Sequence, residues 1–322
     1  MTTRNRGRLA ALLLGLAPLQ AHADPQHLPT PLAPALVPEV PAAAPATTPT
    51  PLPTPVPMHP ALWKVSDADT TIYLFGTIHV LRPGLDWLNG PLAKAVDASD
   101  ELVTEITDPT GTGTQAAVLS RAMLPDNTSL RMLMPPEKRG PYEALMTRIG
   151  LKPEALDRFK PWYASVVLSS LPLLRAGMDP HSGAEAALDA RVTAAKHPHT
   201  GLETVDYQLG LFDSLPQDAQ LALLDSVVTD YDTVAPQIDL LIGDWGRGDA
   251  DGLATAMNAD MDDPRLVETL LKGRNRNWAK WIEARLGRPG TVFVAVGAGH
   301  LAGSGSVQDQ LAKAGIKVTR VQ

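Results

Sequence analysis

Two apolar stretches, far apart in the chain, end in the same way. The first is YLFGTIHV, residues 73–80, and the second is VFVAVGAGHL, residues 292–301. Each is rich in apolar residues, which is typical of a buried strand, and each ends in Gly-x-x-His. This repetition constrains the fold more than any other feature, because it requires a sheet in which two separate strands finish on histidine.

Further strand patterns lie near both ends of the sequence, and helical patterns lie between them. Residues 62–65 and 70–75 are typical of a hairpin, and ELVTEI, residues 101–106, alternates as a strand does. From about residue 115 to 285 the chain has helical signals, including proline at a first turn. We therefore predict a mixed α/β domain with a mixed central β-sheet, flanking helices and a large helical insertion.

The N-terminus has the features of a secretory signal. Three arginines precede the short apolar run of residues 9–19, and Ala21-His-Ala23 has the small residues that signal peptidase recognises. We predict that residues 1–23 are a signal peptide cleaved before Asp24, with an uncleaved anchor as the alternative. Cleavage would release the protein into the periplasm or outside the cell.

The next segment, residues 24–60, differs in composition from the rest of the chain. Residues 25–60 hold 13 of the 30 prolines, and proline disrupts both helices and sheet ladders. Residues 24–60 are therefore predicted to be a disordered, extended tether rich in proline, alanine and threonine. The folded domain is predicted to span residues 61–322.

Composition excludes several kinds of site and partner. The chain has no cysteine, so disulfides, thiolate metal sites and cysteine nucleophiles are excluded. A net charge of −7 argues against nucleic acid as a partner, since binding to phosphates needs a basic face. We expect no membrane span in the mature form, because no segment after the signal is long and apolar enough. A peptide or another small molecule is the expected substrate.

The two histidines are the first candidates for chemistry. A side chain just beyond a buried strand lies at the carboxyl edge of the sheet, where ligands bind in open α/β proteins. If the two strands are neighbours with the same direction, His79 and His300 converge there. Two neutral imidazoles and a carboxylate would describe a hydrolytic metal site. Alternatively, each histidine only ends its strand and bonds a nearby carbonyl group.

Four other residues could contribute to such a site. Glu105 lies late in ELVTEI among apolar neighbours, and a buried carboxylate is costly unless it is paired or binds metal; it could also face solvent on an edge strand. Glu203 ends a short candidate strand, residues 200–205, although a loop position near a turn also explains it. His181 and Glu185 lie at a predicted helix start, where helix capping accounts for them.

A further group lies on the helix predicted for residues 264–286. Arg274, Asn275 and Trp278 fall on one face of that helix. This face could hold a substrate carboxylate or carbonyl group through the guanidinium fork. A solvated basic helix with Trp278 packed inward is the alternative explanation of the same spacing.

Several stretches together resemble the TraB/GumN family, which also includes the Tiki metalloproteases of animals. The resemblance covers residues 61–322, although residues 111–131 add nothing to it. One Gly-x-x-His is a weak signal, whereas the ordered set is specific. The stretches that carry it are LWKVSDADTTIYLFGTIHVL, ELVTEI, GLETVDYQLGLFDSLP, GDWGRGD, LLKGRNRNWAKWIEARL and VFVAVGAGHLAGSGSVQDQLAKAGIKVTRV.

The resemblance implies a fold similar to that of erythromycin esterase and the ChaN-like haem-binding proteins. It implies that His79, His300 and Glu105 form the active centre, and the Tiki branch cleaves peptides with the help of a metal ion. A divalent manganese, cobalt or zinc ion would then be held by these three residues. The resemblance also marks four other positions as characteristic of the family: Glu203, Arg274, Asn275 and Trp278.

We therefore expect a periplasmic or secreted metal-dependent hydrolase, with peptides as the first candidate substrates. The metal would activate a water molecule and polarise the scissile carbonyl group. Glu203 would transfer the proton, and Arg274 or Asn275 would stabilise the oxyanion. Two alternatives involve no catalysis: a protein that binds haem or a metal ion through the same histidines, and a regulatory protein that has kept only the fold.

Overall fold

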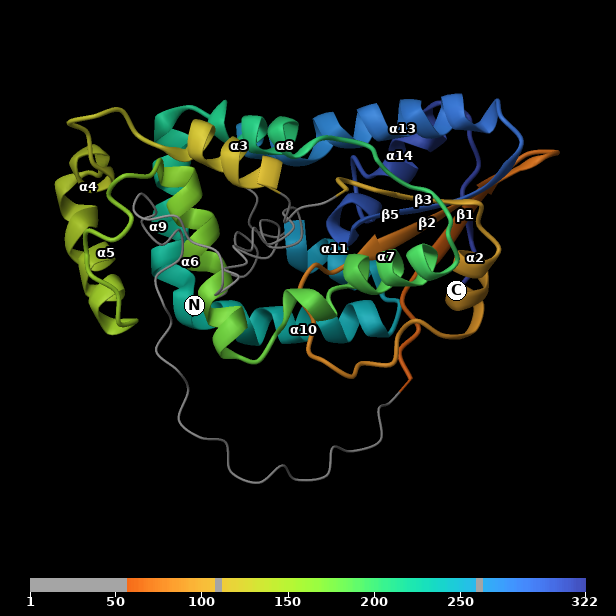
Figure 1. The fold of residues 1–322 in the computed structure, drawn as a ribbon, viewed down its shortest axis with the longest axis horizontal. Helices are drawn as coiled ribbons and strands as arrows, with labels where there is room; N and C mark the ends of the chain where they lie inside the picture. Colours follow the sequence, from red (N-terminus) through yellow and green to blue (C-terminus); the bar gives the residue numbers. More distant parts are fainter. Residues whose placement is uncertain (1–56, 108–111, 259–262) are drawn as a thin grey trace, which may run out of the picture.

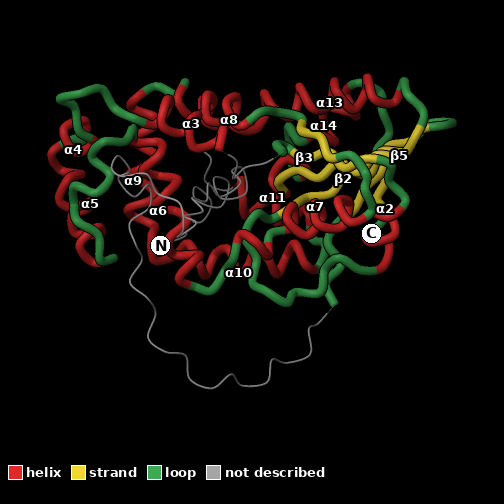
Figure 2. The backbone as a smooth tube through the Cα atoms, viewed as in Figure 1, coloured by secondary structure: helices red, strands yellow, loops and turns green. Residues whose placement is uncertain are grey.

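The computed structural model describes residues 57–322, except for 108–111 and 259–262. The described residues form a six-stranded mixed sheet with helices around it (Figures 1 and 2). The strands are β1 (Leu62–Ser66), β2 (Thr70–Thr77), β3 (Glu101–Thr104), β4 (His199–Gly201), β5 (Gly290–Gly297) and β6 (Thr319–Arg320). Their order in space is β4-β3-β5-β2-β1-β6, and β1 alone runs against its neighbours.

Helices account for most of the rest of the described chain. The α-helices are α2 (Gly90–Asp97), α3 (Thr112–Ala122), α4 (Leu130–Leu133), α5 (Pro136–Arg148), α6 (Pro161–Arg175), α7 (Ala184–Ala194), α8 (Val205–Asp213), α9 (Gln217–Asp230), α10 (Val234–Gly246), α11 (Ala250–Asn258), α12 (Pro264–Val267), α13 (Gly273–Leu286) and α14 (Val307–Lys313). Short 3-10 helices are η1 (Pro180–Ser182), η2 (Tyr231–Thr233) and η4 (Ala298–Leu301), and η3 (Glu268–Lys272) is a π-helix. None of the described helices has the length and apolarity that crossing a membrane requires.

Helices cover the sheet on both faces, and alternation along the central strands divides their side chains between two cores. On β5, Val292 and Val294 belong to the core beneath α13 and α14. Phe293 and Ala295 belong to the opposite core, which includes residues of α2, α7 and α10. The result is a layer of strands between two layers of helices, which explains why the central strands are apolar throughout.

The predicted hairpin at the start of the domain is confirmed. Strands β1 and β2 pair in the antiparallel direction, from Leu62 opposite Phe75 to Ser66 opposite Thr71. The turn between them is closed by the Asp67 carboxylate, which accepts a hydrogen bond from the Thr70 amide at 2.9 Å. An aspartate that bonds the backbone in this way favours a tight turn.

The predicted helical middle of the chain is also confirmed. Between β3 and β5 the described chain contains the three-residue strand β4 and otherwise mainly helices, several of which begin with proline in their first turn. Figure 1 shows helices α4, α5, α6 and α9 at the end of the molecule remote from the sheet, with α10 running between the two parts. The sheet and the helical part are therefore joined along one elongated body.

Two predicted boundaries differ from those in the structure. The candidate strand of residues 200–205 is shorter, because β4 ends at Gly201 and Thr204 already caps helix α8 by accepting a hydrogen bond from the Tyr207 amide. Near the domain start, the amides of Met58 and His59 already bond to the folded part. The predicted signal peptide, and the predicted tether as far as residue 56, lie outside the described residues.

Candidate active site

The two Gly-x-x-His strands are parallel neighbours at the centre of the sheet. Strands β2 and β5 pair over eight positions, from Thr70 opposite Gly290 to Thr77 opposite Gly297. His79 therefore follows the end of β2 by two residues, and His300 follows the end of β5 by three. Both side chains are buried, at 5% and 2% exposure. The expectation that the two histidines arrive at one edge of the sheet is confirmed.

His300 is held at both ring nitrogens. Its Nδ1 lies 2.6 Å from the Asn275 side-chain oxygen, and its Nε2 lies 3.1 Å from an Arg274 nitrogen. The Asn275 amide nitrogen donates to the Gly305 carbonyl at 2.8 Å, which fixes the side-chain oxygen toward the histidine. His300 must therefore donate from Nδ1 and accept at Nε2. Burial, and then the charge of Arg274, hold the pKa of His300 well below its ordinary value of 6.5.

Arg274 lies at the centre of a buried network, with only 3% of its side chain exposed. Its Nε and one terminal nitrogen donate to Glu203, at 3.0 and 2.7 Å. The same terminal nitrogen donates to Glu105 at 2.5 Å. The other terminal nitrogen contacts His300 and donates to the Leu270 carbonyl at 3.3 Å. The five donors of the guanidinium group can thus all be engaged, so the alternative of a solvated Arg274 is wrong.

Neutral donors complete the coordination of both glutamates. One oxygen of Glu105 accepts from the Gly297 amide at 2.7 Å, and the other accepts from Gln208 at 2.9 Å. Glu203 accepts from Gln208 at 3.0 Å and from the Trp278 indole at 3.0 Å. We call Glu105, Glu203, Arg274, Asn275 and His300 the arginine cluster. Because its side chains bond one another, it is a preorganised unit.

Three segments bring the arginine cluster together. Glu105 directly follows β3, and its carbonyl accepts a bond from the Glu203 amide just beyond β4. Arg274 and Asn275 lie in the first turn of α13, which continues directly from the π-helix η3. Trp278, one turn further on, packs beneath the Arg274 guanidinium at 4.7 Å and beside the His300 ring at 4.4 Å. The aromatic face holds both groups in place.

His79 has different surroundings. Its Nδ1 lies 2.6 Å from a carboxylate oxygen of Glu185, which is ion-pair distance, but the groups are not aligned for a hydrogen bond. Its Nε2 is buried and has no hydrogen-bond partner among the described residues. Buried polar atoms of this kind are rare, and they often mark a place where water or a ligand binds.

We call His79 and Glu185 the histidine–glutamate pair. Burial of His79 opposes its protonation more than any other single factor, but the charge and contact of Glu185, with the charge of Glu105, outweigh it and raise the pKa above 6.5. Burial likewise opposes ionisation of Glu185, and His79 outweighs it, so the pKa of Glu185 falls below 4.5. Each partner thus favours the charged form of the other.

A close approach of two backbones places Glu185 beside His79. The amide of Ala184 donates to the Ile78 carbonyl at 3.0 Å. Gly183 precedes it, and a β-carbon at this position would lie 2.1 Å from the His79 carbonyl oxygen. Only glycine fits there without displacing one of the two chains. Helix α7 therefore begins directly against the end of β2, with Glu185 in its first turn.

The expected metal site does not fit this arrangement. The described residues contain no group of three or more histidine, cysteine, aspartate or glutamate side chains that could hold a metal ion. His300 has both ring nitrogens engaged, and both carboxylate oxygens of Glu105 accept hydrogen bonds. The Arg274 guanidinium contacts both residues, and a fixed positive charge repels a cation. Metal binding would require Arg274 to move away from them.

The roles expected for several residues also change. Arg274 and Asn275 are engaged with other protein groups, so they are suited to holding His300 and the glutamates rather than to binding an oxyanion directly. Glu203 accepts bonds from three side chains. Sequence reasoning set Glu185 aside as a helix-start residue and missed Gln208. The available signal for Glu185 was the glycine at the helix start two residues before it, because glycine allows the close approach of a second backbone.

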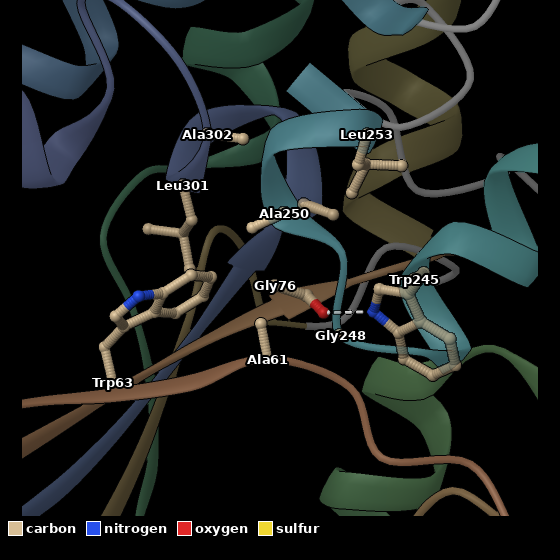
Figure 3. A pocket seen from close by; sticks show the side chains of 10 residues that line it. Ala61, Trp63, Gly76, Trp245, Gly248, Ala250, Leu253, Leu301 and Ala302 are labelled. Carbon is tan, nitrogen blue, oxygen red and sulfur yellow. Dashed lines mark hydrogen bonds between the residues drawn. The ribbon is translucent and has the colours of Figure 1, made fainter. Parts of the chain in front are cut away.

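A small apolar pocket lies elsewhere on β2 and η4 (Figure 3). Its lining is glycine, alanine, leucine and tryptophan, without ionisable side chains: Ala61, Trp63, Gly76, Trp245, Gly248, Ala250, Leu253, Ala298, Leu301 and Ala302. Figure 3 shows the Trp245 indole pointing at the Gly76 carbonyl, to which it donates at 2.7 Å. This contact ties α10 to β2 three residues before His79, so the pocket region helps to position the strand end.

The fold and these two groups define a class: a mixed α/β protein with a buried centre of two histidines, carboxylates and an arginine at the carboxyl edge of its parallel strands. The chain belongs to the TraB/PrgY/gumN family, whose model matches residues 61–320.

Similar curated proteins carry the name YbaP and are described as uncharacterised. The one from Escherichia coli (strain K12) is 25% identical over 257 residues, covering 78% of this chain and 92% of its own length. The one from Shigella flexneri is 26% identical over 244 residues, covering 74% of this chain and 87% of its own length. No solved structure matches.

Proposed function

We propose that this protein is an exported hydrolase, with peptides as the first candidate substrates, and that His79 is its general base. The observation that carries the proposal is the buried, unpartnered Nε2 of His79, whose other nitrogen lies 2.6 Å from Glu185. A histidine that is paired with a carboxylate and unpartnered at its second nitrogen is suited to removing a proton from water or a hydroxyl group. Membership of a family that includes the Tiki metalloproteases supports hydrolysis.

In this reaction, Nε2 of neutral His79 takes a proton from a water molecule as that water attacks a carbonyl carbon. Glu185 stabilises the imidazolium ion that forms, and this ion then returns the proton to the leaving amine as the C–N bond breaks and the carboxylic acid is released. The charge of Arg274 opposes protonation of His79, which favours the neutral form that the base needs before the reaction.

Replacing His79 tests the proposal directly. His79→Ala should lower hydrolysis of a fluorogenic peptide library by about 100- to 10,000-fold, the usual contribution of a general base. The matched control is His59→Ala, an exposed histidine at the start of the domain, which should retain the parent rate. Circular dichroism and thermal unfolding would show that both variants are folded. A folded His79→Ala variant with the parent rate would overturn the assignment.

The metal-dependent route that the family resemblance implies is the competing proposal, with manganese, cobalt or zinc as the ion. Activity that survives dialysis against EDTA would support the histidine–glutamate route. Activity lost in EDTA and restored by one of these ions would support the metal route and would require Arg274 to give up His300 or Glu105. A Soret band on addition of haem, with no hydrolysis under any condition, would instead support the non-catalytic binding protein.

A further inference from the structure

The candidate site carries more negative than positive charge. Glu105 and Glu203 share one guanidinium group, that of Arg274, which lies 2.5 Å and 2.7 Å from them. Among the described residues, Arg274 is the only basic side chain that forms an ion pair with either glutamate. All three side chains are almost fully buried, with 3–6% exposed. The formal charge of these three groups together is therefore −1, in a setting where solvent screens it poorly.

The other partners of the two glutamates do not cancel this charge. The Gly297 amide, the Gln208 amide and the Trp278 indole donate hydrogen bonds, but they are neutral. Hydrogen bonds of this kind reduce the cost of burying a carboxylate without removing its charge.

Glu185 adds a third carboxylate on the side of His79. Its side chain is 26% exposed, far more than those of Glu105 and Glu203, so it is the carboxylate that an approaching ligand meets first. One of its oxygens is buried and lies 2.6 Å from Nδ1 of His79. When His79 is neutral, as its role as a base requires, the whole site carries three carboxylates against one guanidinium group.

We infer that the substrate carries a positive charge, such as a lysine, arginine or N-terminal ammonium group, beside the bond that is cleaved. This inference rests on the proposed function and names its substrate class. A cation next to the scissile bond would offset the excess negative charge and would lie nearest to Glu185, the most exposed of the three carboxylates. An anion at the same place would be repelled by every unbalanced carboxylate of the site.

Matched peptides test the inference in the wild-type protein. Three fluorogenic peptides would differ only in having lysine, glutamine or glutamate beside the cleaved bond. We expect kcat/KM to fall in the order lysine, glutamine, glutamate, with at least about a tenfold difference between the first and the last, given the strength of charge interactions at buried sites. Equal values, or a preference for glutamate, would overturn the inference while leaving the hydrolase assignment in place.

Binding separates this inference from the proposed function. The same three sequences, with a reduced amide at the cleaved bond, would be titrated calorimetrically into the wild-type protein. Tighter binding of the lysine peptide supports the charge inference even if no peptide is hydrolysed, an outcome that would contradict only the hydrolase. The absence of any lysine preference in binding contradicts the charge inference.

A charge-removing variant tests which residue causes the preference for the lysine peptide. Glu203→Gln removes one negative charge and should lower the ratio of kcat/KM between the lysine and glutamate peptides by several-fold. Glu137→Gln, an exposed acid on α5 in the remote helical part, should leave the ratio unchanged. An equal change of this ratio in both variants would contradict an origin of the charge preference at the candidate site. If Glu203→Gln does not fold, the wild-type kinetic and binding comparisons decide the matter by themselves.

Discussion

His79 and His300 are the same residue type at the same edge of the sheet, but their surroundings give them opposite proton affinities. Both are buried, which lowers the pKa of each. His300 faces Arg274, which lowers its pKa further, whereas His79 faces Glu185, which raises its pKa above 6.5. Groups of one type with pKa values driven apart are typical of sites in which each has a separate task. In the proposed mechanism the two tasks are proton transfer for His79 and support of Arg274 for His300.

The pH dependence of the reaction should therefore follow His79. The base must be neutral to accept a proton, so kcat/KM should rise with pH and level off above the pKa of His79, which lies above 6.5. Glu185→Gln removes the charge that raises this pKa, so the inflection should move to lower pH, and the limiting rate should fall by about 100-fold or more. A pH–rate profile of both proteins is the measurement. An inflection that stays in place in Glu185→Gln would show that another group controls the rate.

At the scale of elements, the end of β2 depends on contacts from segments far along the chain. The Leu81 backbone bonds the amide of Asp179, the Ile78 carbonyl bonds that of Ala184, and Trp245 bonds the carbonyl of Gly76. These bonds lie on both sides of His79 in the sequence. The histidine is thus fixed by backbone on each side, which favours a single ring position.

Gly183 is the most sensitive point of this arrangement. In Gly183→Ala the new β-carbon would lie 2.1 Å from the His79 carbonyl oxygen, so one backbone must shift. We expect a loss of about 1–3 kcal/mol in the free energy of unfolding, as for other overpacked sites, together with a loss of hydrolysis because His79 and Glu185 separate. Urea unfolding and peptide hydrolysis are the measurements.

Gly113→Ala is the matched control for that change. Gly113 lies in the first turn of α3, and nothing would lie within 4 Å of an added β-carbon. This substitution should leave activity unchanged and should not lower stability, because alanine is a better helix former than glycine. Two alanine variants with the same stability would contradict the close approach at Gly183.

Sequence patterns predicted the strands and helices better than they predicted the contacts between them. The apolar runs before His79 and His300 predicted two buried strands, and the shared pattern predicted that their ends converge. Helix capping alone accounts for Glu185 in the sequence, because its partner His79 lies far away along the chain and no local periodicity signals such a contact. The sequence also could not show that all donors of Arg274 are engaged. Spacing on a helix predicts which side chains share a face, but not which groups they bond to.

At the scale of the whole molecule, the described residues form one elongated body, with the sheet at one end and helices α4, α5, α6 and α9 at the other (Figure 1). The arginine cluster draws on segments that follow β3, β4 and β5 and on the start of α13, whereas the histidine–glutamate pair joins the end of β2 to α7. The candidate site therefore exists only when distant parts of the chain have assembled. Substitutions in any of these segments can affect it.

For the chain as a whole, we predict export from the cytoplasm. We expect the mature protein to begin at Asp24 and to be recovered from the periplasmic fraction of a bacterial host, which intact-mass spectrometry can establish. Ala23→Leu places a large residue where signal peptidase requires a small one, so that variant should keep residues 1–23. Wild-type protein found at full length in the cytoplasm would contradict the export signal.

Because of the π-helix η3, the geometry of the arginine cluster depends on the number of residues that precede α13 as well as on their chemistry. A π turn accommodates one more residue than an α turn. The residues of α13 are therefore rotated by about 100° from where an uninterrupted α-helix continuing from α12 would place them. Arg274, Asn275 and Trp278 share that rotation. Insertion or deletion of a single residue in the helix before Arg274 would turn all three side chains in a new direction, although none of them is replaced.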